Sequence, residues 1–348
     1  MEILNLKNHN IQNIPESILK LTKLKRLILS NNQIAEIPEY LCELSNLEEI
    51  LLSNNKIQSV PQSLSKLVNL KTINLSQNQI RNIPYSLSLL QKLESLILVN
   101  NKFQEIPLFI KNLSNLKVLC LWDNQLKEFP DFLLNNQHLY YLSLYDNDIK
   151  IIPQCISKLK KLKYLSLGNN KLTQLPDCFD SMDNLKELRL YDNQINHIPE
   201  SIFQLEQLEF LDLSGNQINH IPESIAQLEQ LEFFDLSGNQ INHIPESILH
   251  LTQLEGLCLD GNQITEIPYG ISSLIKLEVL YLAENKIKEI PEEISNLKAL
   301  KILDLSNNSI TQIPKFMCKL NSLEEIYLDG NDIKEIPESI KYIWEPSE

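Results

Sequence analysis

The chain of 348 residues lacks several features that would assign it to a common class of protein. It has no uninterrupted apolar stretch near the roughly 18 residues that a membrane-spanning helix needs, so no span is expected. Its first ten residues, MEILNLKNHN, show neither a basic region before an apolar core nor a small-residue cleavage site, so no secretory leader is expected. A nucleotide-binding G-x-x-x-x-G-K-[ST] loop is also missing from the sequence.

Clustered cysteine and an excess of positive charge are missing as well. The six cysteines are scattered along the chain and form no group at either end, which favours a reducing cytoplasm as the compartment. With 31 basic residues against 45 acidic ones the net charge is −14. A balance of this sign argues against binding to nucleic acid or to an anionic membrane.

What the chain has instead is one segment repeated along its whole length. Prolines recur every 23 residues from Pro15 to Pro337, without insertion or deletion. A leucine stands nine residues before each proline, from Leu6 to Leu328, and an asparagine stands six residues before it in every copy except the first, which has His9. Self-similarity at a fixed period of this length indicates a stacked repeat, in which each coil contacts only its neighbours.

The shared pattern L-x-x-L-x-L-x-x-N-x-I-x-x-I-P resembles the 23-residue, Ile-Pro class of leucine-rich repeats. That class occurs in the cytosolic Ras-group-related family, in Roco GTPases and in many bacterial proteins, and the resemblance covers residues 1 to 343. It implies an α/β-type solenoid, a leucine-rich repeat horseshoe of about fifteen coils. A parallel β-sheet would line the concave face, and short turns or extended chain would form the convex face. The family's shared activity is the binding of other macromolecules.

Each repeat divides into a strand, a turn and a return segment. The segment L-x-x-L-x-L alternates apolar and variable residues, as a half-buried strand does. A proline in each short return segment favours extended chain and short turns over long α-helices. The asparagine between them is expected to hydrogen-bond backbone groups of adjacent coils, because a buried amide needs such partners. The predicted ladder is Asn32, Asn55, Asn78, Asn101, Asn124, Asn147, Asn170, Asn193, Asn216, Asn239, Asn262, Asn285, Asn308 and Asn331.

The unbroken period predicts a single solenoid over residues 1–348 in place of the two domains that this length would ordinarily suggest. Residues 338–348 are predicted to form a C-terminal partial coil or cap, with Ile340, Ile343 and Trp344 folding over the last coil. One repeat has Asn136 where the others have Leu, Ile or Met, and we expect its turn to be locally loose.

Alternation directs three strand positions of each repeat away from the core, those twelve, ten and eight residues before the proline. The first five repeats hold no aromatic residue there, whereas repeats six to eleven do, and we interpret the aromatics as confined to the middle of the chain. Aromatic residues and arginine are enriched at interface hot spots. The predicted protein-binding concave surface is Trp122, Tyr141, Tyr145, Tyr164, Arg189, Tyr191, Phe210, Asp212, Phe233 and Asp235. The aspartates, with Asp123, Asp146 and Asp192 one residue beyond their strands, are expected to select a basic partner.

Three other interpretations compete with these assignments. The tyrosines could merely pack against one another across strands. His197, His220 and His243 share one position in three successive repeats and could hold a transition metal, although a local duplication explains the row equally well. Cys155 and Cys178 are equivalent in adjacent repeats and could form a disulfide or remain two unrelated thiols.

The sequence therefore predicts a non-enzymatic, cytoplasmic interaction module or scaffold that uses no cofactor and no metal. No nucleophile has a base and an orienting group at a recognisable spacing. The resemblance adds an alternative, a regulatory or sensor subunit for a separately encoded GTPase or effector enzyme, with a small GTPase as partner. A further alternative is a structural protein that assembles through its ends, although we expect a monomer.

Overall fold

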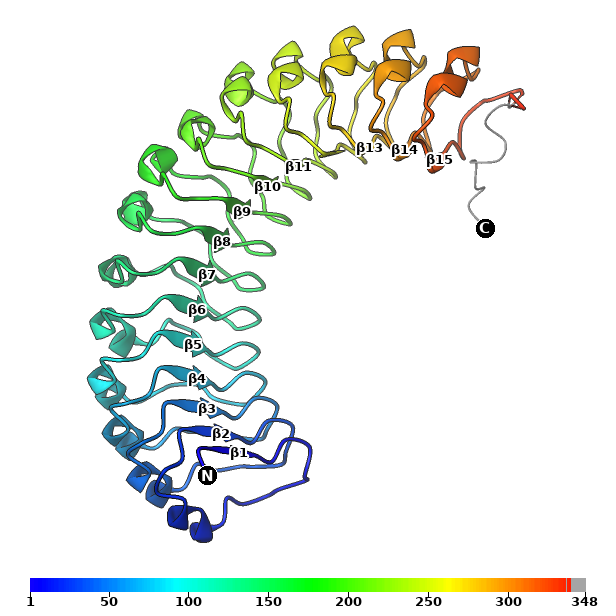
Figure 1. The fold of residues 1–348 in the computed structure, drawn as a ribbon. Helices are drawn as coiled ribbons and strands as arrows, with labels where there is room; N and C mark the ends of the chain where they lie inside the picture. Colours follow the sequence, from blue (N-terminus) through cyan, green and yellow to red (C-terminus); the bar gives the residue numbers. More distant parts are fainter. Residues whose placement is uncertain (336, 339–348) are drawn as a thin grey trace. The chain divides into compact units, whose positions relative to one another are not determined.

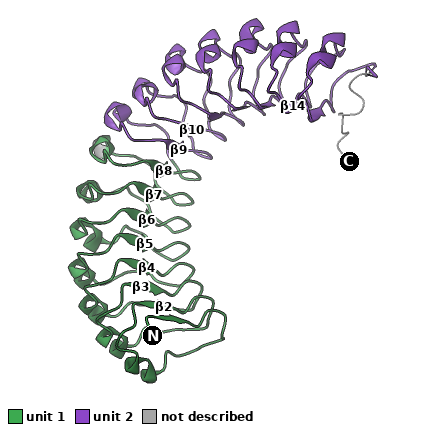
Figure 2. Ribbon diagram, in the orientation of Figure 1, with its two compact units in different colours: residues 1–171 green, residues 172–348 purple. Residues whose placement is uncertain are grey.

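The computed structural model describes residues 1–335, 337 and 338 of the chain. It contains two compact units, residues 1–171 and residues 172–348, which are coloured separately in Figure 2. Each unit is a stack of repeats, with one three-residue strand and one short 3-10 turn in each complete repeat (Figure 1). The prediction that one uninterrupted solenoid covers residues 1–348 remains a prediction.

Unit 1 contains eight strands, β1 to β8, and seven 3-10 turns, η1 to η7. The strands are β1 Ile3–Asn5, β2 Arg26–Ile28, β3 Glu49–Leu51, β4 Thr72–Asn74, β5 Ser95–Ile97, β6 Val118–Cys120, β7 Tyr141–Ser143 and β8 Tyr164–Ser166. The turns are η1 Glu16–Lys20, η2 Glu39–Glu43, η3 Gln62–Lys66, η4 Tyr85–Leu89, η5 Leu108–Asn112, η6 Asp131–Asn135 and η7 Gln154–Lys158.

The described residues of unit 2 continue the alternation with seven strands, β9 to β15, and seven turns, η8 to η14. The strands are β9 Glu187–Arg189, β10 Phe210–Asp212, β11 Phe233–Asp235, β12 Gly256–Cys258, β13 Val279–Tyr281, β14 Ile302–Asp304 and β15 Glu325–Tyr327. The turns are η8 Phe179–Ser181, η9 Glu200–Gln204, η10 Glu223–Gln227, η11 Glu246–His250, η12 Tyr269–Ser273, η13 Glu292–Asn296 and η14 Lys315–Lys319.

Within each unit, neighbouring strands are parallel and are offset by one repeat of 23 residues. Leu119 pairs with Leu142 in unit 1, and Phe210 pairs with Phe233 in unit 2. Residues at the same position of successive repeats therefore lie side by side, about 4.8 Å apart. The 3-10 turns lie on the opposite side of the stack from the strands (Figure 1). The predicted leucine-rich repeat solenoid, with parallel strands and short turns in place of long helices, is confirmed.

The apolar positions of the repeat form one core between the strands and the turns. In the tenth repeat the seven predicted core residues are all at most 5% exposed; they are Leu208, Leu211, Leu213, Ile218, Ile221, Ile225 and Leu228. On the outer side, the repeated proline precedes the turn, and its carbonyl oxygen accepts a hydrogen bond from the amide three residues later, as Pro222 does from Ile225. Among the described residues no helix is long and apolar enough to cross a membrane.

The repeated asparagine connects its own coil to the preceding coil by hydrogen bonds. The side-chain amide of Asn216 donates to the carbonyl oxygens of Leu190, Leu213 and Ser214, each at 3.0 Å. Its Oδ1 accepts the backbone N–H of Ile195, also at 3.0 Å. The side chain thereby satisfies donors and acceptors that the turn would otherwise leave buried without partners.

The residue directly before this asparagine adopts the left-handed backbone conformation. Its φ is 53° at Asn54 and 54° at Asp123, and in four repeats of unit 2 glycine takes this place, as at Gly215 with φ 63°. Asn, Asp and Gly are the residues that tolerate this conformation best. The left-handed backbone therefore explains why aspartate occurs at positions 123, 146 and 192. The presence of Asp123, Asp146 and Asp192 is thus not evidence for a basic partner.

The predicted C-terminal cap lies mostly outside the described residues, because Ile340, Ile343 and Trp344 are not described. The turn before Asn136, η6, has the same length and the same closing amide-to-carbonyl bond as its neighbours. Asn136 itself is completely buried, and its amide donates to the carbonyls of Ile110 and Leu113 at 2.9 Å. Its Oδ1 accepts no hydrogen bond from the described residues.

Asn136→Leu is predicted to raise the free energy of unfolding by about 1 kcal/mol, because it removes a buried acceptor without a partner and restores the apolar residue of the other repeats. Urea unfolding followed by circular dichroism measures the change. Asn135→Leu, at the exposed neighbouring position, is the matched control and should give no gain. A variant at position 136 that unfolds at lower urea than the parent would contradict this account.

Candidate interaction surface on the strand face

The outward positions of the strands form the strand face of each unit, and the aromatic side chains at these positions are half-buried. In unit 1 the ring of Trp122 stacks on Tyr145, with centroids 4.8 Å apart and planes 12° apart. Tyr141 and Tyr164 lie 5.8 Å apart and are tilted by 40°. Both contacts join equivalent positions of adjacent repeats, as the register requires. We call these four residues the unit 1 ring cluster.

In unit 2 the predicted residues form a second, more regular stack. The rings of Phe210 and Phe233 are 4.9 Å apart and nearly parallel, at 6°. The guanidinium carbon of Arg189 lies 4.6 Å from the centre of the Phe210 ring, and its Nε is 2.5 Å from Oε1 of Glu187. Gly256 follows in the same row, and a Cβ there would lie 2.4 Å from Cδ2 of Phe233. The glycine therefore leaves the space that the Phe233 ring occupies.

The rings of each stack pack on one another, as one interpretation of the sequence expected, and they also remain half-exposed. Ring faces inside a stack are covered, so a partner would meet ring edges and tyrosine hydroxyls. Packing across strands and binding to a partner are thus compatible in this geometry. Tyr191 is also half-buried and stands two residues beyond the end of β9 in unit 2.

Aspartates line the strand face of unit 2 beside this stack. Asp212 accepts hydrogen bonds from the backbone N–H and the hydroxyl of Ser214, at 3.0 and 2.7 Å. Asp235 accepts the N–H of Ser237 at 2.8 Å, and burial together with the charge of Asp212 raises its pKa. Burial and nearby carboxylates also raise the pKa of the Cys258 thiol, which therefore stays protonated at neutral pH.

Sequence reasoning missed several residues of this surface. Tyr281 and Tyr327 occupy the middle outward positions of β13 and β15, so the interpretation that aromatics are confined to repeats six to eleven is wrong. Asp260 and Asp304 extend the acidic residues in the same direction. The sequence pattern could have identified these two tyrosines and two aspartates. They stand ten or eight residues before the prolines of the last four repeats, Pro268, Pro291, Pro314 and Pro337.

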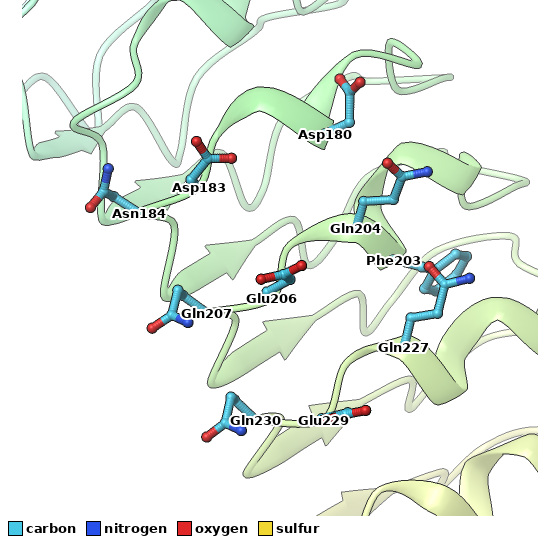
Figure 3. Close-up of a pocket in the computed structure, with 10 residues that line it drawn as sticks. All are labelled: Asp180, Asp183, Asn184, Phe203, Gln204, Glu206, Gln207, Gln227, Glu229 and Gln230. Atoms are coloured by element: carbon cyan, nitrogen blue, oxygen red, sulfur yellow. The ribbon is translucent and has the colours of Figure 1, made fainter.

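A groove of about 1050 Å³ lies away from the strand face, between the turns and the loops that lead into β9, β10 and β11 (Figure 3). Carboxylates such as Asp183, Glu206 and Glu229 and amides such as Gln204 and Gln227 line it, as Figure 3 shows. Its lining contains no histidine, cysteine, serine or lysine, and consists of carboxylates, amides and one phenylalanine.

The other candidate sites of the sequence are the row of three histidines and the pair of cysteines. His197, His220 and His243 are exposed, and the described residues contain no group of three or more His, Cys, Asp or Glu side chains that could hold a metal ion. Cys178 is half-buried, and the side chain of Cys155 lies outside the described residues, so the choice between a disulfide and two unrelated thiols remains a prediction.

Comparison with known proteins assigns the family. The leucine-rich repeat family matches residues 1–57, 45–103, 114–172 and 275–333, and a leucine-rich repeat region matches residues 193–286. A leucine-rich repeat protein from Leptospira interrogans is 32% identical over 99% of this chain and 95% of its own, with a TM-score of 0.92. This chain is a leucine-rich repeat protein.

Other solved leucine-rich repeat structures are also similar. An internalin from Listeria monocytogenes is 27% identical, covering 90% of this chain and 88% of its own, with a TM-score of 0.80. The Arabidopsis receptor kinase HAESA, solved with the peptide hormone IDA and the co-receptor SERK1, is 29% identical over 99% of this chain and 64% of its own, with a TM-score of 0.76. No curated protein matches the chain in sequence.

The acidic part of the leucine-rich repeat surface makes stability depend on pH. The pKa of Asp260 is raised from 3.8 to about 6, mainly by burial. The carboxylates of Asp304, Asp235 and Glu284 raise this pKa further, whereas the hydrogen bond from the N–H of Ala283 lowers it. The folded protein thus binds more protons than the unfolded chain between these pH values. Its free energy of unfolding falls as pH rises through that window, and the ionised carboxylate destabilises the fold above it.

Asp260→Asn is therefore predicted to raise the free energy of unfolding by about 1 kcal/mol near neutral pH, with little effect near pH 4. The amide oxygen of the variant can still accept the N–H of Ala283, so the hydrogen bond is kept. Urea unfolding at the two pH values measures the difference. An equal effect at both values would show that the ionised carboxylate does not cause it.

Proposed function

We propose that this chain is a non-enzymatic, cytoplasmic protein-interaction module that binds a partner protein through its strand face. The observation that supports this most is the unit 1 ring cluster, where two pairs of large side chains stay half-exposed on a rigid sheet. Large rings held by packing lose little conformational entropy when a partner binds, which makes them efficient anchors.

The comparisons support the same class of function. Leucine-rich repeat proteins are typically interaction modules, and the similar structure of HAESA contains a bound peptide hormone and a co-receptor. The cytoplasmic assignment depends on the thiols. Cys42 and Cys258 are buried and free, and a reducing compartment would keep such groups unoxidised.

The double variant Trp122→Ala/Tyr145→Ala is predicted to fold normally and to lose at least about 2 kcal/mol of partner binding, because it deletes the stacked anchors of unit 1. The parent and the variant are each used as bait, and quantitative mass spectrometry compares the proteins that they capture. The control is Tyr269→Ala, which removes an exposed aromatic residue, 75% accessible, from the turn side in η12.

Proteins captured by the parent and the Tyr269→Ala control, and lost from the double variant, identify partners of the strand face. Equal capture by all three baits would contradict a binding role for the unit 1 ring cluster. Circular dichroism and urea unfolding of the double variant separate a loss of binding from a loss of fold.

A further inference from the structure

The strand face of unit 2 has two parallel rows of different chemistry between β10 and β14. The first outward position of these strands gives an apolar row: Phe210, Phe233, Gly256, Val279 and Ile302. The second outward position gives Asp212, Asp235, Cys258, Tyr281 and Asp304, and Asp260 stands at the third position of its repeat. We call the four aspartates the acidic row.

The acidic row has no cationic partner within the described residues. Asp212 and Asp304 accept hydrogen bonds from Ser214 and Ser306, and Asp260 accepts one from the N–H of Ala283, but no lysine or arginine forms an ion pair with any of the four. The fifteen outward positions of β10 to β14 and the residues that follow them contain four aspartates and no basic residue. Carboxylates held this close together favour a partner that brings positive charge.

The acidic side chains are also fixed in place. The serine hydroxyls of Ser214 and Ser306 each lie 2.7 Å from an aspartate oxygen two residues earlier on the same strand. These bonds orient the carboxylates without neutralising them. A cationic ligand would therefore meet a preorganised set of acceptors, which lowers the entropic cost of binding.

The spacing of the rows defines the shape of the ligand. Adjacent rows are two residues apart along each strand, or about 6.6 Å, and five strands extend about 19 Å across the stack. An extended peptide of about six residues covers this length, and its alternate side chains point in opposite directions. One set would lie over Phe210, Phe233, Val279 and Ile302, and the other would lie over Asp212, Asp235 and Asp304.

We propose that the strand face of unit 2 binds an extended peptide segment in which cationic and apolar residues alternate. This inference rests on the proposed interaction function and specifies the chemistry of one partner. The arginine or lysine side chains of the segment pair with Asp212, Asp235 and Asp304, and its apolar side chains pack along the Phe210–Phe233 stack and the aliphatic residues that continue it.

The test uses the full chain and a fluorescein-labelled eight-residue peptide of alternating arginine and leucine, followed by fluorescence anisotropy at physiological salt. Saturable binding is expected, and Asp212→Asn/Asp235→Asn should weaken it about tenfold. The matched control Glu223→Gln/Glu246→Gln removes the same net charge from the turns of the same two repeats, where both glutamates are exposed. This control should change the affinity by less than about twofold.

A second peptide, with four arginines followed by four leucines, has the same composition but cannot present its side chains alternately. It should bind about fivefold more weakly than the alternating peptide, because its cationic and apolar groups cannot reach both rows at once. Phe233→Ala should weaken the alternating peptide and leave the variant folded, since the ring is half-exposed.

Equal weakening by the two charge variants would overturn the inference, because net charge alone would then explain binding. Equal affinity for the two peptides, or no saturable binding, would overturn it as well. The general interaction function would still stand in those cases if the unit 1 ring variant loses its captured partners, so the two proposals fail separately.

Discussion

The hydrogen bonds of the repeated asparagine are the constraint on which the rest of the structure depends. A coil of 23 residues with a strand of only three residues leaves most backbone groups of its turn without strand partners. In unit 2, Asn216 supplies four hydrogen bonds to groups of the preceding and the same coil. In unit 1, Asn78 makes the same bonds to Leu52, Leu75, Ser76 and Ile57. The coils are thereby fixed in a single register, and a slip of one residue would bury the outward side chains.

Fixed register converts a linear repeat into rows of equivalent side chains. Phe210 stacks on Phe233, and Trp122 stacks on Tyr145, because both pairs are separated by one repeat. The same rule brings Asp212 beside Asp235 and raises the pKa of the latter, since burial and like charge both disfavour the ionised form. The residues at the three outward positions of each repeat therefore determine the chemistry of the strand face.

The period predicted the fold, the strand positions, the core and the outward residues, because each follows from alternation and a spacing of 23. What it did not predict depended on contacts or on careful extension of the pattern. Asn136 keeps a regular turn because its amide finds two carbonyl oxygens, which no propensity indicates. Asp123 was read as part of a binding surface, although its positive φ of 54° already accounts for it. Tyr281 was missed because the outward positions were not examined beyond repeat eleven. The sequence pattern also does not show that stacking covers the faces of the rings.

The most direct test of the register constraint is the stability of Asn216→Ala beside that of Gln217→Ala, an exposed neighbour on the same turn. Urea unfolding monitored by circular dichroism should show a loss of about 2–3 kcal/mol for the first variant, because four backbone groups lose their shared partner. The second variant should unfold like the parent. Equal stability of the two variants would contradict the claim that the asparagine bonds hold the coils in register.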